Sequence, residues 1–315
     1  MDVFRDSEAE LNRFLAQNLK QYSRLRNFDF GPDKRHNVSL LSKYISHRVI
    51  DEYDVVRATL GVSTHERAEK FIQEVFWRVY WKGWLEHRPT VWSDFVAFDQ
   101  QDKLISQKDN KNYLAAINGE TGIECFDFWA QELRNTNYLH NHARMWFASI
   151  WIFTLGLPWQ AGAQFFLQHL LDGDAASNTL GWRWVAGIQT MGKCYLARAE
   201  NISKFTGGRF DNARLNERAL PLVDEKVHVV QPIDYEISTK QKFETLLIMD
   251  SNLNMLKRNE TKNYKKIYVM SLANASRQIA ISPSVAEFKQ NLIKSAAQKY
   301  PQCEVLDARE ARQVL

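Results

Sequence analysis

Glycine and proline are scarce in this chain, numbering 13 and 7 among 315 residues. Because both residues form the turns between many short strands, their scarcity favours long helices over an all-β architecture. The three cysteines, Cys125, Cys194 and Cys303, lie far apart, which excludes a disulfide framework and a Cys-x-x-Cys metal site. We therefore expect a reduced, cytoplasmic protein that holds no metal.

A large charge excess and long hydrophobic runs are also missing. Basic residues number 41 and acidic residues 37, and a net charge of +4 does not by itself predict nucleic-acid binding. The first fifteen residues are charged and contain no apolar signal core. The apolar run Met145–Pro158 is too short to span a bilayer, so we expect a buried helix there and no membrane segment.

Helical periodicity dominates the first two thirds of the chain. The predicted helices cover residues 6–24, 63–85, 112–135 and 138–156. In the segment NVSLLSKYIS, Asn37 or Ser39 is a suitable cap for a further helix. The apolar fraction of 45% is sufficient for a sizeable core in a chain of this length.

After Phe210 the pattern changes to short apolar runs that are typical of strands. Strands are predicted at Glu244–Met249, Lys266–Ser271 and Cys303–Leu306, with a helix at Ser284–Gln298. We therefore predict a mainly α fold in which a helical domain, residues 1–222, is followed by a small α/β C-terminal region, residues 223–315.

One segment, LLDGDAASNTLGWRWVAG, concentrates carboxylates, an amide and aromatic rings. It contains, in order, Asp172, Asp174, Asn178, Trp182, Arg183 and Trp184. Upstream, the sequence HNHARM supplies Arg144, an available partner for a buried carboxylate. Each feature alone is compatible with an Asp-Gly turn and core tryptophans. Together they favour a site for a polar, redox-active ring between aromatic walls.

The DGDxAxN…WxW block, preceded by LHNxxRM, resembles the signature of the photolyase/cryptochrome family. The resemblance is continuous from about Gly119 to Phe210. Weaker similarities extend back to Val38, where VSLLSKYI resembles the family's TSRLSPYL and EVFWR resembles its ELIWR. A long spaced block is more specific than a short motif. The resemblance implies a helical domain that binds FAD bent into a U.

The resemblance also implies which residues bind FAD. Ser39 and Ser42 would contact the phosphates, and Asn178 would face N5 of the flavin. Arg144 and Asp172 would form a salt bridge beside the ring. The full set implied for FAD binding is Ser39, Leu41, Ser42, Arg78, Asn141, Arg144, Asp172, Asp174 and Asn178.

A catalytic function follows from the same resemblance. Photolyases are lyases that use blue light to pass an electron from reduced FAD, their chromophore, to a pyrimidine lesion flipped out of DNA. The lesion pocket would be lined by Glu74, Trp77, His142, Met145 and Trp184. The catalytic residues would be Asn178, Trp182, Trp159 and Glu74. Trp182 and Trp159 would carry electrons, and a distal carrier aligns with Ser106, with Trp129, Trp151 or Tyr113 as substitutes.

Several departures leave a second function open. His142 replaces an arginine that many dimer photolyases carry, and Arg183 replaces a glutamine. The helical pattern begins almost at Met1, where family members carry an α/β antenna domain, so no antenna chromophore is expected. The first hypothesis is repair of damaged DNA, single- or double-stranded. The alternatives are a blue-light receptor without repair activity, and a degenerate member that acts through partners.

Overall fold

The computed structural model describes residues 2–100, 111–224, 226–233 and 243–311. The chain divides into two compact units. Unit 1 comprises residues 1–20, 39–76 and 233–315, and unit 2 comprises residues 21–38 and 77–232. Helix α5 (His65–Glu86) contributes its first half to unit 1 and its second half to unit 2. Among the described helices, none combines the length and apolar character that crossing a membrane requires.

The helical part of unit 1 begins with α1 (Val3–Gln17), which starts where the carboxylate of Asp2 accepts from two backbone N–H groups. The short helix α3 (Ser42–Ser46) and α4 (Glu52–Val62) follow. The apolar face of α1 packs through Phe14 against Phe71 of α5, with ring centroids 4.7 Å apart. These helices bury the hydrophobic residues that the periodic pattern places on one face.

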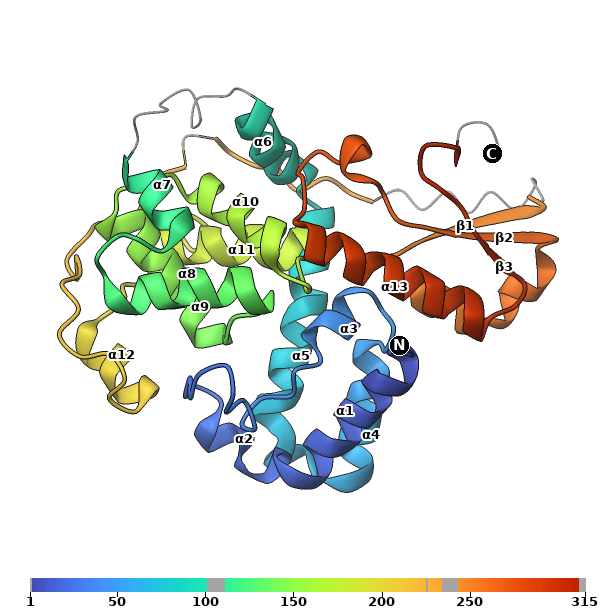
Figure 1. Ribbon diagram of the computed structural model, residues 1–315, viewed down its shortest axis with the longest axis horizontal. Coiled ribbons are helices and arrows are strands. Elements are labelled where there is room, and N and C mark those ends of the chain that lie inside the picture. Colours follow the sequence, from blue (N-terminus) through green and yellow to red (C-terminus); the bar gives the residue numbers. More distant parts are fainter. Residues whose placement is uncertain (1, 101–110, 225, 234–242, 312–315) are drawn as a thin grey trace. The chain divides into compact units, whose positions relative to one another are not determined.

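The C-terminal part of unit 1 is a small parallel sheet. Strands β1 (Thr245–Met249), β2 (Lys266–Met270) and β3 (Cys303–Val305) pair in that order. Helix α13 (Pro283–Lys299) begins after the cap residue Ser282 and lies along β2 and β3 (Figure 1). A helix between parallel strands is the connection that a parallel sheet requires. This part confirms the α/β pattern predicted from the sequence.

Unit 2 is a helical assembly around fully buried tryptophans. Its elements are α2 (Leu19–Leu25, which starts at the boundary with unit 1), α6 (Pro89–Gln100), α7 (Lys111–Asn118), α8 (Glu124–Thr136), α9 (Asn141–Ser149), the π-helical turn η1 (Ile150–Thr154), α10 (Trp159–His169), α11 (Ala175–Ala186) and α12 (Ala199–Thr206). Helix α9 packs against α8 and α11, and α11 packs against α10 (Figure 1). The side chains of Trp129, Trp146 and Trp151 have no exposed surface. A mainly α fold with a small α/β unit is therefore confirmed.

Two of the predicted helices are broken in the structure. Residues 112–135 form α7 and α8 rather than one helix, because the GETG turn between them places Gly119 and Gly122 at positive φ. The carboxylate of Asp127 accepts from the backbone N–H of Thr121 at 2.8 Å and of Gly122 at 2.9 Å. Similarly, residues 6–24 break at Asn18 into α1 and α2. Both breaks depend on local turn chemistry that periodicity does not detect.

Candidate cofactor site

A buried carboxylate, Asp172, lies at the centre of a charged cluster in unit 2. The guanidinium of Arg144 on α9 donates to both oxygens of Asp172, each at 3.1 Å. Arg78 on α5 donates to Oδ2 of the same carboxylate at 3.3 Å. Removing a carboxylate from water is costly unless it is paired, and the two-point Arg144 contact is the strongest form of such a pair. The predicted Arg144–Asp172 salt bridge is present.

The orientation of Arg144 is set by its own surroundings. Its Nε donates to the carbonyl oxygen of Leu139 at 2.9 Å, and its guanidinium carbon lies 5.5 Å from the ring centre of Tyr138. Burial raises the pKa of Tyr138 to about 12, so that this phenol stays protonated beside the cation. The segment that precedes α9 thus holds the arginine in place for Asp172.

A second carboxylate, Asp174, begins α11 next to this pair. It caps the helix by accepting from the backbone N–H of Ser177 at 2.7 Å. The ammonium of Lys82 lies 3.7 Å from its Oδ2. Arg78 and Lys82 are four residues apart on α5, so one helical face supplies both cations. The sequence reasoning did not include Lys82 among the cofactor residues, although its spacing from Arg78 was the signal for it.

Three cations gather around these two carboxylates. Arg78 and Arg144 contact Asp172, and Lys82 contacts Asp174. Cationic groups gathered in a partly buried place favour an anionic ligand group.

The next turns of α11 carry the other predicted residues of the set. Asn178 is buried, and its Nδ2 donates to the carbonyl oxygen of Ala163 on α10 at 2.8 Å. This contact fixes which way the amide oxygen points. One turn further, Trp182 is buried edge-on to Phe166, with ring centroids 5.0 Å apart. A Cβ atom on Gly162 would lie 2.2 Å from the Trp182 ring, so α10 can approach α11 here only through a glycine.

A hydrogen-bonded pair of rings lies beside Trp184. The imidazole of His142 contacts the carbonyl oxygen of Asn27 through Nδ1 at 2.9 Å and the hydroxyl of Tyr195 through Nε2 at 3.1 Å. Burial lowers the pKa of His142, which favours the neutral ring. Nδ1–H then donates to Asn27, and Nε2 accepts from Tyr195. Tyr195 stacks on Trp184 at 5.7 Å. Tyr195 was missed in the sequence because it lies outside the WxW block.

Other predicted residues are distributed over both units. Ser39, Leu41, Ser42 and Glu74 belong to unit 1, whereas Trp77, Asn141 and Met145 belong to unit 2. Asn141 is the exposed first residue of α9, and Met145 is half-buried one turn later. Leu41 is buried and precedes α3. The roles of these residues in binding remain predictions.

The predicted helix cap in this segment is wrong. The N-cap position of α3 is Leu41, which makes no side-chain cap hydrogen bond. The amide of Asn37 instead donates to the carbonyl oxygens of Leu25 and Phe28, at 2.8 and 2.7 Å. Ser39 accepts from the N–H of Leu41 at 3.5 Å, which is a turn contact rather than a cap. Asn37 therefore stabilises the end of α2 and the residues that follow it, and not the start of α3.

The predicted electron carriers have different surroundings. Trp159 is buried at the start of α10, where the guanidinium of Arg183 lies 5.9 Å from its ring centre. Arg183 is itself buried and pairs with Asp224 at 2.7 Å. Trp182 contacts Trp151 at 6.1 Å, and Trp151 contacts Tyr113 at 6.0 Å. Trp129, the third substitute, stacks on Trp146. Ser106 lies outside the described residues.

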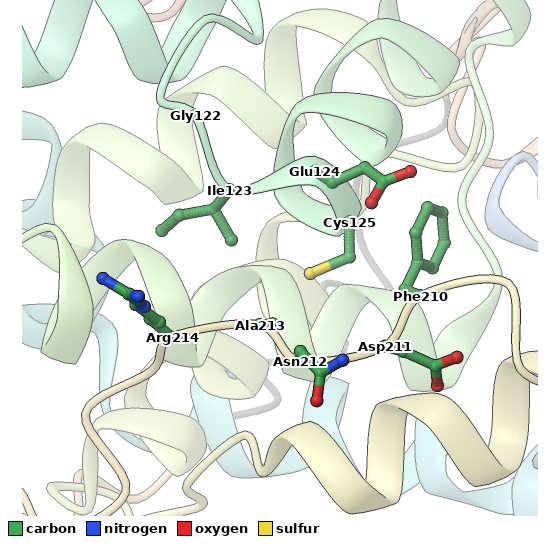
Figure 2. A pocket seen from close by; sticks show the side chains of 9 residues that line it. All are labelled: Gly122, Ile123, Glu124, Cys125, Phe210, Asp211, Asn212, Ala213 and Arg214. Carbon is green, nitrogen blue, oxygen red and sulfur yellow. The ribbon is translucent and has the colours of Figure 1, made fainter.

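A separate polar pocket of about 400 Å³ opens where the start of α8 faces residues 210–214 (Figure 2). Its wall includes the side chains of Glu124, Asp211 and Arg214, and the thiol of Cys125. Burial raises the pKa of Cys125 to about 12, so this thiol is protonated and unreactive. Within the described ranges no cluster of three metal-ligating side chains occurs here or elsewhere. None of the predicted site residues lines this pocket.

The charged cluster lies within a segment that is similar to known proteins. Residues 71–214 match the family described as FAD binding domain of DNA photolyase. This segment, a little under half of the chain, is therefore similar to the FAD-binding domain of DNA photolyases. FAD is the cofactor that this family of domains binds, in agreement with the prediction from the sequence.

Curated relatives match this chain over only part of their own length. The deoxyribodipyrimidine photo-lyase of Vibrio cholerae is 28% identical over 66% of this chain and 44% of its own length. That of Agrobacterium fabrum is 33% identical over 56% of this chain and 37% of its own length. The chain thus spans less than half the length of these curated relatives.

Solved structures of the photolyase/cryptochrome family have the same fold. A class III photolyase from Agrobacterium tumefaciens is similar over 65% of this chain and 42% of its own, with a TM-score of 0.55 and 29% identity. A cryptochrome from Synechocystis has a TM-score of 0.55 over 65% of this chain and 43% of its own, at 21% identity, which supports the fold alone.

The residues of the cluster fit this cofactor. FAD carries an anionic diphosphate and a polar ring, and the cluster offers three cationic side chains next to buried donors. Two of these donors have no hydrogen-bond partner within the described part of the chain, the Oγ of Ser177 and the indole Nε1 of Trp182. Buried polar atoms are normally paired, so unpaired ones on the helix that Asp174 caps suit a polar ligand.

Proposed function

We propose that this chain acts in light-driven repair of a pyrimidine lesion in DNA, using electron transfer from reduced FAD. The observation that carries the proposal is the buried Asp172, which Arg144 and Arg78 hold from two helices. It lies within the segment that matches the FAD-binding domain of DNA photolyase. Burying these charges carries a desolvation cost, and the ion pairs hold both arginines beside the start of α11.

FAD, when bound and reduced, supplies the electron that light excitation makes available. The protein residues bind and orient it. Arg78, Lys82 and Arg144 attract the anionic parts of the cofactor, and Asp172 keeps the two arginines apart and in position. The Asn178 amide, whose nitrogen is held by Ala163, presents its oxygen as an acceptor. The indole of Trp182 would supply a buried N–H donor to the cofactor.

The lesion site in this proposal lies against aromatic side chains. Trp77 is 48% exposed and Trp184 is half-buried, so both retain ring surface on which a flipped base can stack. Met145 supplies a flexible apolar contact. Glu74 is proposed as a hydrogen-bond acceptor for the base, and Ser39, Leu41 and Ser42 are proposed as phosphate contacts.

One observation favours the second candidate, a blue-light receptor that performs no repair. Both ring nitrogens of His142 are already hydrogen-bonded within the protein. A neutral, internally bonded histidine cannot replace an arginine as a cationic contact to a DNA phosphate. In the repair proposal His142 therefore positions Tyr195 and Trp184 and does not bind the phosphate.

A two-step experiment tests the proposal. The purified protein is first examined for a flavin absorbance spectrum, and is then illuminated under reducing conditions with an oligonucleotide that contains pyrimidine dimers. Light-dependent loss of dimers, absent in the dark and reduced in Asp172→Asn, is the expected result. A flavin-containing protein that leaves all dimers intact would support the receptor. A protein that takes up no FAD would overturn both functions.

A further inference from the structure

Glu132 on α8 is a buried carboxylate that the candidate cofactor site does not include. Only 5% of its surface is exposed. Its Oε1 accepts from the guanidinium of Arg35, which lies in the segment between α2 and α3. Its Oε2 is also buried and has no hydrogen-bond partner within the described part of the chain. Because an unpaired buried carboxylate oxygen is costly when charged, this arrangement suits a carboxyl group that takes up a proton.

The charged groups that face Glu132 come from three other segments. Arg35 and Asp29 lie between α2 and α3. Arg209 follows α12, and Tyr138 precedes α9. Asp29 is itself buried and pairs with Arg209 at 3.0 Å. Burial has the largest effect on Glu132, and together with the charge of Asp29 it outweighs the two arginines. The pKa of Glu132 is thereby raised to about 7, so its charge changes near neutral pH.

Arg35 connects this carboxyl group to the candidate cofactor site through Tyr138. The guanidinium carbon of Arg35 lies 4.3 Å from the ring centre of Tyr138, and that of Arg144 lies 5.5 Å from the same centre. The charges of Asp172 and Glu132 both act on the Tyr138 hydroxyl. Charges so close together in a poorly solvated place also act on one another. The protonation state of Glu132 therefore changes the electrostatic potential at Arg144 and Asp172.

The sign of this effect favours an anionic ligand. A proton on Oε2 removes the negative charge of Glu132 and leaves the guanidinium of Arg35 without its counter-charge beside Tyr138. The added positive charge strengthens the attraction for the FAD diphosphate. Because such coupling is reciprocal, a bound anion also favours the protonated form of Glu132. We propose that binding of the anionic cofactor is coupled to uptake of a proton from solvent at Oε2 of Glu132, and that Arg35 transmits the resulting charge to the site.

This inference rests on FAD binding at the candidate site and is independent of repair. The test measures the dissociation constant of FAD for the full-length apoprotein in the dark, by flavin fluorescence, from about pH 6 to about pH 8.5. The wild type is expected to bind FAD roughly fivefold more tightly at the acidic end, which is at the low end of typical couplings between two sites. Calorimetry near pH 7, in two buffers of different ionisation enthalpy, is expected to show uptake of a fraction of a proton on binding.

Matched variants assign the effect to Glu132. Glu132→Gln imitates the protonated form, so its FAD affinity is expected to be independent of pH and to equal the acidic value of the wild type even at about pH 8.5. A residue with a purely structural role would not produce tighter binding when it is replaced. Glu132→Asp keeps a titrating group and is expected to keep a pH dependence. Glu124→Gln, which neutralises an exposed carboxylate on the same helix, is expected to keep the wild-type profile.

Several results would overturn the inference. One is a wild-type profile in Glu132→Gln, when circular dichroism shows that the variant is folded. Another is an FAD affinity of the wild type that does not change with pH, or binding without proton uptake; neither measurement depends on a variant, and both leave the cofactor site itself intact. A wild type that takes up no FAD at any pH would overturn the cofactor site and the coupling together. The expected pH dependence without dimer repair would support the coupling and count against repair alone.

Discussion

The ammonium of Lys289 donates to Oδ2 of Asp250 at 2.8 Å, and both residues are buried at the carboxyl end of the parallel sheet in unit 1. The hydroxyl of Ser271 donates to the same oxygen at 2.8 Å. The Nδ1–H of His47 donates to the backbone carbonyl of Asp250 at 2.9 Å. Residues 203 positions apart in the chain are thereby joined. The C-terminal strands are thus attached to the segment that contains α3.

The first prediction concerns this buried ion pair. Lys289→Met should lower the free energy of unfolding by about 3–5 kcal/mol, because it leaves the carboxylate of Asp250 buried without its counter-charge. The double variant Asp250→Asn/Lys289→Met should recover part of the loss. Urea denaturation followed by circular dichroism provides the measurement. The control is Lys265→Met, which removes an exposed pair with Glu244 and should cost less than about 1 kcal/mol.

A second prediction concerns the pH dependence of stability. Burial lowers the pKa of His140 to about 4, and its Nδ1 accepts from the backbone N–H of His142 at the start of α9. Its folded pKa lies below the unfolded value of about 6.5. The folded state therefore has its full stability above pH 6.5, where His140 is neutral in both states. As the pH falls towards 4, the free energy of unfolding decreases by an amount on the order of 3 kcal/mol, because the unfolded state binds a proton that the folded state excludes.

The variant His140→Asn isolates this contribution. Asparagine also caps a helix but does not titrate, so the variant should lose much of the decrease in stability between pH 6.5 and 4. His36→Asn, at an exposed position, should keep the wild-type profile. Denaturation midpoints across this pH range are the measurement. An unchanged profile in His140→Asn would assign the decrease to other groups.

The third prediction concerns retention of FAD. Asp172→Asn removes the charge that Arg144 and Arg78 share, and should weaken FAD binding by roughly 10- to 100-fold, equivalent to about 1–3 kcal/mol. The measurement is the flavin-to-protein absorbance ratio after dialysis, with thermal unfolding of the apoprotein as a check of folding. Arg134→Met on the surface of α8 is the matched control. Equal flavin content in both variants would contradict the assigned site.

The fourth prediction concerns the close contact of α10 with α11. Gly162→Ala would place a methyl group 2.2 Å from the ring of Trp182, and should cost about 1–3 kcal/mol of stability through overpacking. Gly181 neighbours Trp182 in the chain, and a Cβ there meets no atom within 4 Å. Gly181→Ala should therefore be neutral or stabilising by up to about 1 kcal/mol. If both variants unfold at the same urea concentration, the predicted contact is not formed.

Local pattern predicted much of the fold. The predicted helix 63–85 corresponds to α5, and the predicted strands of the tail correspond to β1, β2 and β3 within a few residues. Patterns of this kind succeed because side chains that share one face of a helix or strand are buried together. The two helix breaks, in contrast, depended on a turn held by Asp127 and on the junction at Asn18.

The candidate site was predictable only where charge and spacing carried information. Arg144 and Asp172 could be paired from the sequence, because a buried carboxylate needs a cation. Arg183 lies between Trp182 and Trp184 with no partner evident in the sequence, and the structure buries it against Asp224. Its partner lies 41 residues away in a segment with no motif, so only packing brings the two together.

The sequence by itself determined the mainly helical character, the strands of the tail and the position of the block rich in carboxylates and tryptophans. These properties follow from periodicity and residue type, which act over a few turns of chain. The tertiary structure decided that His142 bonds to Tyr195, that Gly162 admits Trp182 and that Lys82 joins Arg78 around the two carboxylates. Such contacts depend on the meeting of distant segments, which local pattern does not encode.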